Sequence, residues 1–419
     1  MIPKSGLVAF PVVVLLAATA GAEMMDRPAG IKIGQRMTLK PYVSASASYD
    51  SNVGSRNEEK EGDVMWTVNP GLGLTYNAEN WALQLDAYYA YHAYCRNERT
   101  TDYNNHSYGE NLRWNWSDSK GGEKGWSLML TESFQQVTMA DDMTYNGGTY
   151  NADRQQFNVA GGVQRRFNEH WHTDLDAGYY WLNYDNDNKM NASLYGWQRW
   201  TAGLAAGFAP SPWTDFIIAG SYQGYEQDNA GRYVSSGRSR NISSSSDGWT
   251  LQGGIGSYAT ERISYRLLAG WSRFNYGNGA KKDNGFIYSA SGNWKISDTL
   301  STMLLASSYY QPSEREYASA ARVDSVSWGL AKSFIRGKLV GTLDAVYRHE
   351  THKHVDTSSG NYDIDVVTGR IGLTYTLNRF FSFFTYGEYQ NSWNSHSGDR
   401  GGAYDYDRWL LTAGVRLTY

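Results

Sequence analysis

Residues 81–94 read Trp-Ala-Leu-Gln-Leu-Asp-Ala-Tyr-Tyr-Ala-Tyr-His-Ala-Tyr and alternate between two kinds of side chain. In an extended chain one face carries Trp81, Leu83, Leu85, Ala87, Tyr89 and Tyr91, and the other carries Gln84, Asp86, Tyr88 and His92. This period of two is typical of a β-strand with one apolar and one polar face. Soluble strands usually have about five or six residues. A strand of this length instead suits the roughly 9 to 11 residues, plus overhang, that cross a membrane at a tilt.

The same alternation recurs throughout residues 38–419. It predicts an all-β fold, a transmembrane antiparallel up-and-down β-barrel of about 18 strands. The predicted strands are 38–52, 63–76, 81–95, 104–118, 125–138, 152–167, 170–184, 195–208, 213–226, 247–258, 262–276, 284–296, 300–310, 323–335, 339–350, 364–377, 380–394 and 405–419. Short and long connections alternate between them, as they must if both termini are periplasmic. A propeller or a sandwich is the alternative, but a propeller blade needs four short strands where this chain has two long ones.

Five charged residues fall on the predicted lipid face. They are Glu110, Glu132, Arg165, Arg273 and Lys332. An Arg or Lys in the middle of the bilayer costs up to about 2–4 kcal/mol. These residues therefore lie near an interface, or a bulge shifts the register there, in which case 16 strands are possible.

The composition agrees with a barrel and excludes other classes of protein. The 419 residues include 33 Tyr, 16 Trp and 44 Gly, yet the mean hydropathy is -0.58. Alternation explains this value, because only every second residue of a strand meets lipid. The net charge of -4 comes from 38 basic and 42 acidic residues spread evenly, so we expect no nucleic-acid partner. Cys95 is the single cysteine, which excludes an internal disulfide.

The N-terminus predicts export. Lys4, the apolar residues 6–19 and the small residues 20–22 match a secretory signal peptide over residues 1–22. Residues 23–37 would form a short periplasmic segment, and residues 38–419 the barrel. The predicted location is the bacterial outer membrane, in contact with its lipid.

The last strand predicts a partner. One face carries Trp409, Leu411, Ala413, Val415, Leu417 and the terminal Tyr419. This pattern resembles the C-terminal signal that the barrel assembly machinery reads. The alternative is an amphipathic last strand without a targeting role.

The start of the predicted barrel resembles a known family. Residues 41–53 form a strand that ends in a Tyr-Asp-x-Asn-like turn, and the next strand carries an Asp and a Pro-Gly-Leu sequence. This arrangement is similar to the putative beta-barrel porin 2 family, on the residues Tyr49, Asp50, Asn52, Asp63, Pro70, Gly71 and Leu72. The resemblance implies an outer-membrane pore in a family often linked with exopolysaccharide production and export, and it brings no catalytic residues.

Charged residues on the polar face are the candidate lining of the lumen. The basic ones are Lys40, Arg113, Arg166, Arg199, Arg262, Arg266, Lys295, Arg348, Arg370 and Arg416; the acidic ones are Asp86, Asp174, Asp176, Asp215, Asp344 and Glu388. Because rings of charge set the selectivity of a pore, the basic excess favours anions. The alternative is that these charges pair across neighbouring strands and merely keep the lumen wet.

Tyrosines on the same face suggest saccharide stacking. They are Tyr42, Tyr88, Tyr94, Tyr180, Tyr309 and Tyr386. Aromatic rings stack on the apolar faces of sugars, although tyrosine is common in barrels generally. Loop 227–246 could fold inward as a constriction bearing Arg232, Arg238 and Arg240, or remain a surface loop.

Enzyme and cofactor functions have little support in the sequence. His352 and His354 share one side of an extended segment that could bind a transition metal, but a solvated loop is the simpler interpretation. We find no nucleophile elbow and no catalytic carboxylate pair, and expect no enzyme activity, metal or cofactor.

The sequence therefore predicts a porin-like channel that passes small hydrophilic solutes or saccharides passively. The alternative is a structural or adhesive barrel with a closed lumen and partner-binding loops. The sequence does not indicate an oligomeric state.

Overall fold

A computed structural model describes residues 30–52, 60, 62–95, 106–118, 124–145, 148–185, 196–211, 213–227, 232–235, 238–241, 245–276, 282–312, 318–354, 362–394 and 405–419. The predicted signal peptide lies outside the described residues. Within them, no helix is long and apolar enough to cross a membrane.

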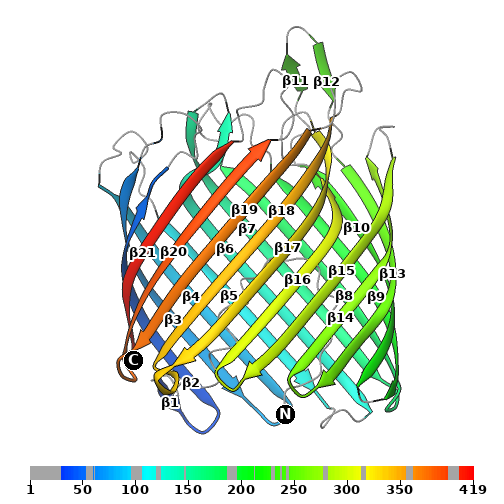
Figure 1. Ribbon diagram of the computed structural model, residues 1–419, viewed down its shortest axis with the longest axis horizontal. Helices are drawn as coiled ribbons and strands as arrows, with labels where there is room; N and C mark the ends of the chain where they lie inside the picture. The colour runs from blue at the N-terminus through cyan, green and yellow to red at the C-terminus, as the bar shows by residue number, and fades with distance from the viewer. Residues whose placement is uncertain are drawn as a thin grey trace.

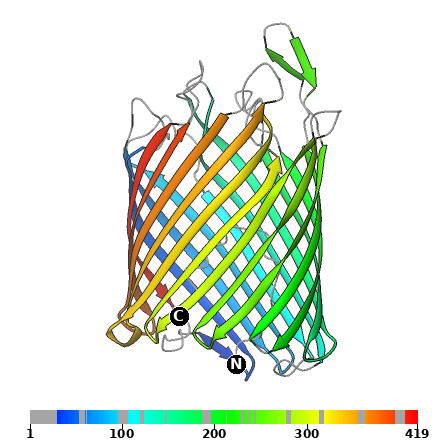
Figure 2. The ribbon, with the colours of Figure 1, turned by 45° about the vertical axis from the view of Figure 1, so that its right-hand side comes forward.

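The described strands form one closed antiparallel barrel (Figures 1 and 2). Eighteen strands make the wall, and the ring closes where β21 pairs with β2. The wall strands are β2 (Met37–Asp50), β3 (Asp63–Asn77), β4 (Trp81–Tyr94), β5 (His106–Ser117), β6 (Gly125–Tyr145), β7 (Gly148–Arg166), β8 (Trp171–Asp185), β9 (Trp197–Ser211), β10 (Thr214–Gln227), β13 (Ser245–Thr260), β14 (Ile263–Tyr276), β15 (Lys282–Ser297), β16 (Leu300–Pro312), β17 (Ala318–Phe334), β18 (Leu339–His354), β19 (Tyr362–Thr376), β20 (Phe381–Asn394) and β21 (Tyr406–Thr418). The predicted fold class and strand number are confirmed.

The two rims of the barrel differ. Connections at the rim where β2 begins and β21 ends are short, and we call this the short-turn end. The opposite rim is the long-loop end. Asparagine caps two of the short turns: the Asn168 side-chain oxygen accepts from the main-chain N–H groups of His170 and Trp171, both at 2.8 Å. Asn378 does the same in the turn between β19 and β20 with Phe380 and Phe381, at 2.8 and 3.0 Å. These side chains satisfy donors that the turn leaves unpaired.

Additional strands lie at both rims. β1 (Ile31–Ile33) pairs with the start of β2 at the short-turn end. Beyond the long-loop rim, β11 (Arg232–Ser235) and β12 (Arg238–Asn241) form a separate hairpin (Figures 1 and 2). The structure thus places this part of loop 227–246 outside the barrel, which agrees with the surface-loop alternative and not with an inward constriction.

The outward face of the wall is apolar and bordered by aromatic rings. On β8, Trp171, Leu175 and Tyr179 are exposed in turn, and on β9 the exposed residues include Trp200 and Leu204. Large rings thus lie toward both ends of the strands, with aliphatic side chains between them. This is the arrangement that faces lipid in outer-membrane barrels.

The basic residues on this face lie near its aromatic borders. The Arg165 guanidinium carbon is 4.6 Å from the centre of the Trp126 ring, one residue from the end of β7. Lys332 is two residues from the end of β17, and Arg273 lies opposite Trp249. Strand pairing is continuous at Arg165, Arg273 and Lys332, so no bulge shifts the register there. All three residues therefore lie on the outward face.

Glu110 and Glu132 also remain on the outward face. Glu110 pairs with Phe134 and Glu132 with Leu112, so the two carboxylates are diagonal neighbours on adjacent strands. Pairing of β5 with β6 is unbroken here. Both carboxylates lie farther from the long-loop end than the exposed ring of Tyr108. A position near the membrane interface therefore does not explain these two charges.

Candidate channel lining

The interior face of the wall carries nearly all the predicted charged residues. On each strand it is the face opposite the exposed apolar side chains, and the strand register places on it Lys40, Arg113, Arg166, Arg199, Arg266, Lys295, Arg348, Arg370 and Arg416, with Asp86, Asp174, Asp176, Asp215, Asp344 and Glu388. Arg262 is the exception. It lies exposed in the turn before β14, which begins at Ile263, so its prediction as a wall residue is wrong.

One interior cluster lies near the closing strands. The Tyr42 hydroxyl donates to Asp86 over 3.1 Å, and the Arg416 guanidinium carbon is 3.9 Å from the centre of the Tyr42 ring. Gly71 lies opposite Tyr42, and a Cβ there would be 2.2 Å from the ring. The ring therefore lies against a position that only glycine can occupy. Arg416 contacts the ring, so little of it is left for sugar stacking.

A second cluster spans three strands near the short-turn end. His172 Nε2 is 2.9 Å from Asp215 Oδ2, and Nδ1 is 3.5 Å from Asp174 Oδ2. The imidazole reaches β10 across β9 because Gly207 leaves the space, since a Cβ there would be 2.1 Å from the ring. Sequence reasoning did not select His172 as a site residue. The signal in the sequence was Gly207, which lies opposite His172 and leaves room for its side chain to cross β9.

Ion pairs neutralise part of the predicted basic excess. Arg370 binds Glu388 on the next strand, and its guanidinium carbon is 5.6 Å from the centre of the Tyr386 ring. Arg348 is 2.8 Å from Glu350 Oε1, and Lys295 is 3.8 Å from Asp298. Pairing across neighbouring strands is thus present for Arg370, and the anion preference of the wall stays a prediction.

Glu350 also holds His352. The two side chains are 2.7 Å apart and both are buried on the interior face of β18. Residues 349–354 belong to β18 and His352 is buried, so the interpretation of this segment as a solvated loop is wrong. The side chain of His354 lies outside the described part of the structure. Among the described residues, no group of three or more His, Cys, Asp or Glu is arranged to hold a metal ion.

An aromatic cluster lies on the interior face of β8, β9 and β10. The rings of Tyr180 and Trp197 are stacked with centroids 4.6 Å apart, and Tyr225 lies 5.2 Å from Trp197. Arg199 lies 5.8 Å from the Tyr180 ring centre. Trp197 and Tyr225 were not among the predicted stacking residues. The cluster thus brings rings from three adjacent strands together.

The other predicted tyrosines are distributed around the ring. Tyr88 and Tyr94 share the interior face of β4 with Asp86. Tyr309 pairs with the fully buried Val323 near the long-loop end, and Tyr386 lies on β20 beside Arg370. Tyr88 and Tyr94 thus share one strand and Tyr42 interacts with Tyr88, whereas Tyr180, Tyr309 and Tyr386 lie on other strands of the wall.

The tip of β16 narrows the interior near the long-loop end. The Gln223 side-chain amide donates to the main-chain carbonyl of Tyr310 over 3.2 Å. Gln223 is on β10, and β13, β14 and β15 lie between β10 and β16 in the wall. The tip therefore turns inward past its neighbours. Tyr310 packs there with the buried Phe274 and Ile287.

The residues that carry the family resemblance hold the closing strands together. Arg408 on β21 donates from Nε to both oxygens of Asp50, at 3.0 and 2.9 Å. The side-chain amide of Asn52 donates to the Asp407 carbonyl over 3.0 Å. Asp63 pairs with Asp50 across β2 and β3. The Asp and Asn of the motif thus join the first wall strand to the last.

Comparison with known proteins gives a family match and distant structural likenesses. The family model described as putative beta-barrel porin 2 matches residues 27–199 and 223–419. No curated protein matches the chain. The FrpB iron transporter from Neisseria meningitidis is similar with a TM-score of 0.47 and 9% identity, covering 95% of this chain and 83% of that chain. The ferric-catecholate import receptor Fiu from E. coli K12 has a TM-score of 0.42 and 9% identity, covering 92% and 82%.

Proposed function

Because the chain belongs to the putative beta-barrel porin 2 family, we propose that it is a channel of the bacterial outer membrane that passes small hydrophilic solutes passively. The observation that carries the proposal is the closed ring with charged and polar side chains on its interior face and an apolar band outside. A barrel of this strand number is too wide for side chains alone to fill, so the interior is expected to hold water.

The interior aromatic cluster supports saccharides as one class of solute. Tyr180, Trp197 and Tyr225 offer a cluster of three rings, and Arg199 offers hydrogen-bond donors to sugar hydroxyls. A role in exopolysaccharide export is consistent with this cluster and with the family resemblance. Insertion by the barrel assembly machinery and the absence of enzyme activity, metal and cofactor remain part of the proposal.

A second candidate is a structural or adhesive barrel with a closed interior. Burial of Phe274, Val323 and Ile364 near the long-loop end favours it, because these interior-face side chains do not contact bulk water. In this function the surface loops would bind a partner and no solute would pass.

Conductance separates the two candidates. Purified, folded protein in planar bilayers should give stable single-channel steps if it is a channel. Maltodextrins added in salt solution should lower that conductance reversibly, and Trp197→Ala should weaken this block. Folded protein that gives no steps would overturn the channel and leave the closed barrel.

A further inference from the structure

We propose that the long-loop part of the seam between β15 and β16 is a lateral portal. Through it, an amphiphile with one acyl chain and an uncharged, hydroxyl-bearing head group would pass between the barrel interior and the outer leaflet. The inference rests on the proposed function, because it requires a barrel in the outer membrane with an accessible interior.

The seam is the first observation. β15 and β16 pair from the short turn as far as Ser289 and Ser307, and the pairing stops there. Their other edges remain paired: β14 with β15 to Lys282, and β16 with β17 to Pro312. The wall therefore lacks a β-ladder between residues 282–288 and 308–312. The inward turn of the β16 tip toward Gln223 accounts for the missing ladder.

Side chains close the seam in place of the ladder. The Tyr310 hydroxyl lies against Gly285 on β15, where a Cβ would be 2.5 Å from it. Tyr288 reaches from β15 to Asp324 on β17, and Asp324 accepts from Arg322 Nε over 3.0 Å. Opening a ladder inside a membrane would leave backbone groups unpaired, at several kcal/mol each. Opening this seam moves side chains and breaks no ladder.

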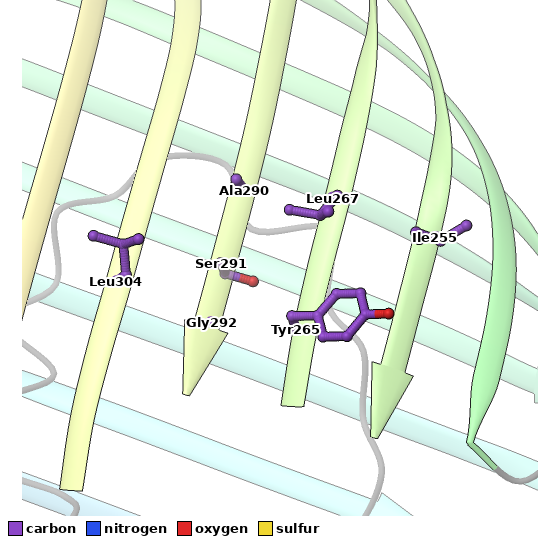
Figure 3. Close-up of a pocket in the computed structure, with 7 residues that line it drawn as sticks. All are labelled: Ile255, Tyr265, Leu267, Ala290, Ser291, Gly292 and Leu304. Atoms are coloured by element: carbon purple, nitrogen blue, oxygen red, sulfur yellow. The ribbon is translucent and has the colours of Figure 1, made fainter. Parts of the chain in front are cut away.

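An apolar hollow lies on the outward face of the same strands. Ile255, Tyr265, Leu267, Ala290, Ser291, Gly292 and Leu304 line a depression of about 410 Å³ (Figure 3). It exists because Gly292 carries no side chain and an added Cβ would meet nothing within 4 Å. Exposed Phe286 and Trp294 lie on either side of Gly292 along β15, so the hollow belongs to the apolar band. In a membrane, an acyl chain is the group that fills such a hollow.

The seam and the hollow together fit one amphiphile. Tyr288 and Gly292 are four residues apart on β15, about 13 Å at 3.3 Å per residue. A head group at the seam with its chain in the hollow has the orientation of an outer-leaflet lipid. Arg322 and Asp324 neutralise each other, and each also hydrogen-bonds a tyrosine hydroxyl, Tyr310 for Arg322 and Tyr288 for Asp324. The seam is therefore a polar site without net charge. Such a site recognises hydroxyls better than a net charge.

The hollow is tested by binding. A spin-labelled alkyl glucoside at low concentration in vesicles containing the full chain should show a motionally restricted fraction. Gly292→Leu fills the hollow and should lower that fraction at least fivefold. Gly369→Leu is the matched control, since Gly369 is on the outward face of β19 with no atom within 4 Å of an added Cβ. Equal spectra for the two variants would overturn the acyl-chain site.

The portal is tested by locking the seam in a Cys95→Ser background. Ile287 and Tyr309 would face each other if the ladder continued, so Ile287→Cys with Tyr309→Cys should lock it on oxidation. Ser291→Cys with Leu305→Cys is the control, because these residues already pair. With alkyl glucoside supplied in the bilayer, the parent channel should show blocking events. The lock should remove them while ion conductance persists at a higher level, because it holds the β16 tip in the wall. Reductant should restore the blocking events, and the control should still be blocked.

The possible failures are distinguishable. Absence of ion conductance in the parent protein would overturn the proposed function and the portal with it. Conductance without blocking events, or with blocking that the lock does not change, would overturn the portal alone. If the locking disulfide does not form, the Gly292→Leu variant tests the portal in the same recording. A frequency of alkyl glucoside blocking events equal to that of the parent channel would also overturn the portal.

Discussion

The side-chain amide of Gln223 donates a hydrogen bond to the main-chain carbonyl of Tyr310, although three strands lie between their own strands in the wall. A strand carbonyl in a barrel normally accepts from the adjacent strand. This one accepts from a side chain across the interior. The narrowing near the long-loop end is thus built by a wall strand and not by a loop that folds inward.

Gln223→Ala should release the tip of β16. A neutral hydrogen bond contributes about 1 kcal/mol net, so its loss should shift the tip roughly fivefold from the inward position toward a released one. Single-channel recordings should show a larger fraction of time at high conductance. Gln252→Ala, another interior glutamine, should not have this effect. Identical records for the two variants would contradict the role of Gln223.

Arg370 and Glu388 should move ion selectivity in opposite directions. Arg370→Gln leaves the Glu388 carboxylate without its partner, and Glu388→Gln leaves the guanidinium without its partner. Reversal potentials in a KCl gradient should shift toward cations for the first variant and toward anions for the second. Shifts of the same sign would show that the pair does not face the permeating ions.

The Asp50 and Arg408 pair should stabilise ring closure. The side chain of Asp50 is 7% exposed and that of Arg408 is 23% exposed. Removing one partner of such a pair costs about 3–5 kcal/mol, and Asp50→Ala should lower the free energy of unfolding in lipid vesicles by this amount. Lys60→Ala breaks the exposed pair with Asp407 nearby, and should cost at most about 1 kcal/mol. Equal losses in urea titrations of the two variants would refute the difference.

Gly71→Ala should destabilise the barrel through the Tyr42 ring. The added methyl group would overlap the ring, and overpacking of this kind typically costs about 1–3 kcal/mol. Tyr42→Ala should relieve the overlap, so the double variant should lose less stability than the two single losses together. Additive losses in the same unfolding assay would mean that Gly71 serves another purpose.

The wall was predictable from the sequence because lipid imposes alternation. Strand 81–95 was predicted and β4 is Trp81–Tyr94, and the count of eighteen was correct. Strand ends at the long-loop rim were less predictable. The strand predicted at 125–138 extends to Tyr145. Beyond the membrane neither face has to be apolar, so the alternation that marks a strand is lost.

Contacts across the interior were not predictable. The charges around Arg370 were placed on the correct face because register alone decides that. The bonds of Gln223 to Tyr310 and of His172 to Asp215 depend on how strands bend and on which neighbours are glycine. The alternation of polar and apolar residues shows neither how a strand bends nor which residue lies opposite on the next strand. Arg262 was misplaced by one residue, at a turn.

The pair that closes the ring also bears on the order of assembly. Asp50 and Arg408 are 358 positions apart in the chain. Contacts so distant in sequence form slowly, because a long loop must first be closed. The ring can therefore be sealed only after its last strand has been delivered, and until then β2 has an unpaired edge. A chain shortened before β21 would keep that edge open and expose it to chaperones, proteases and other strands.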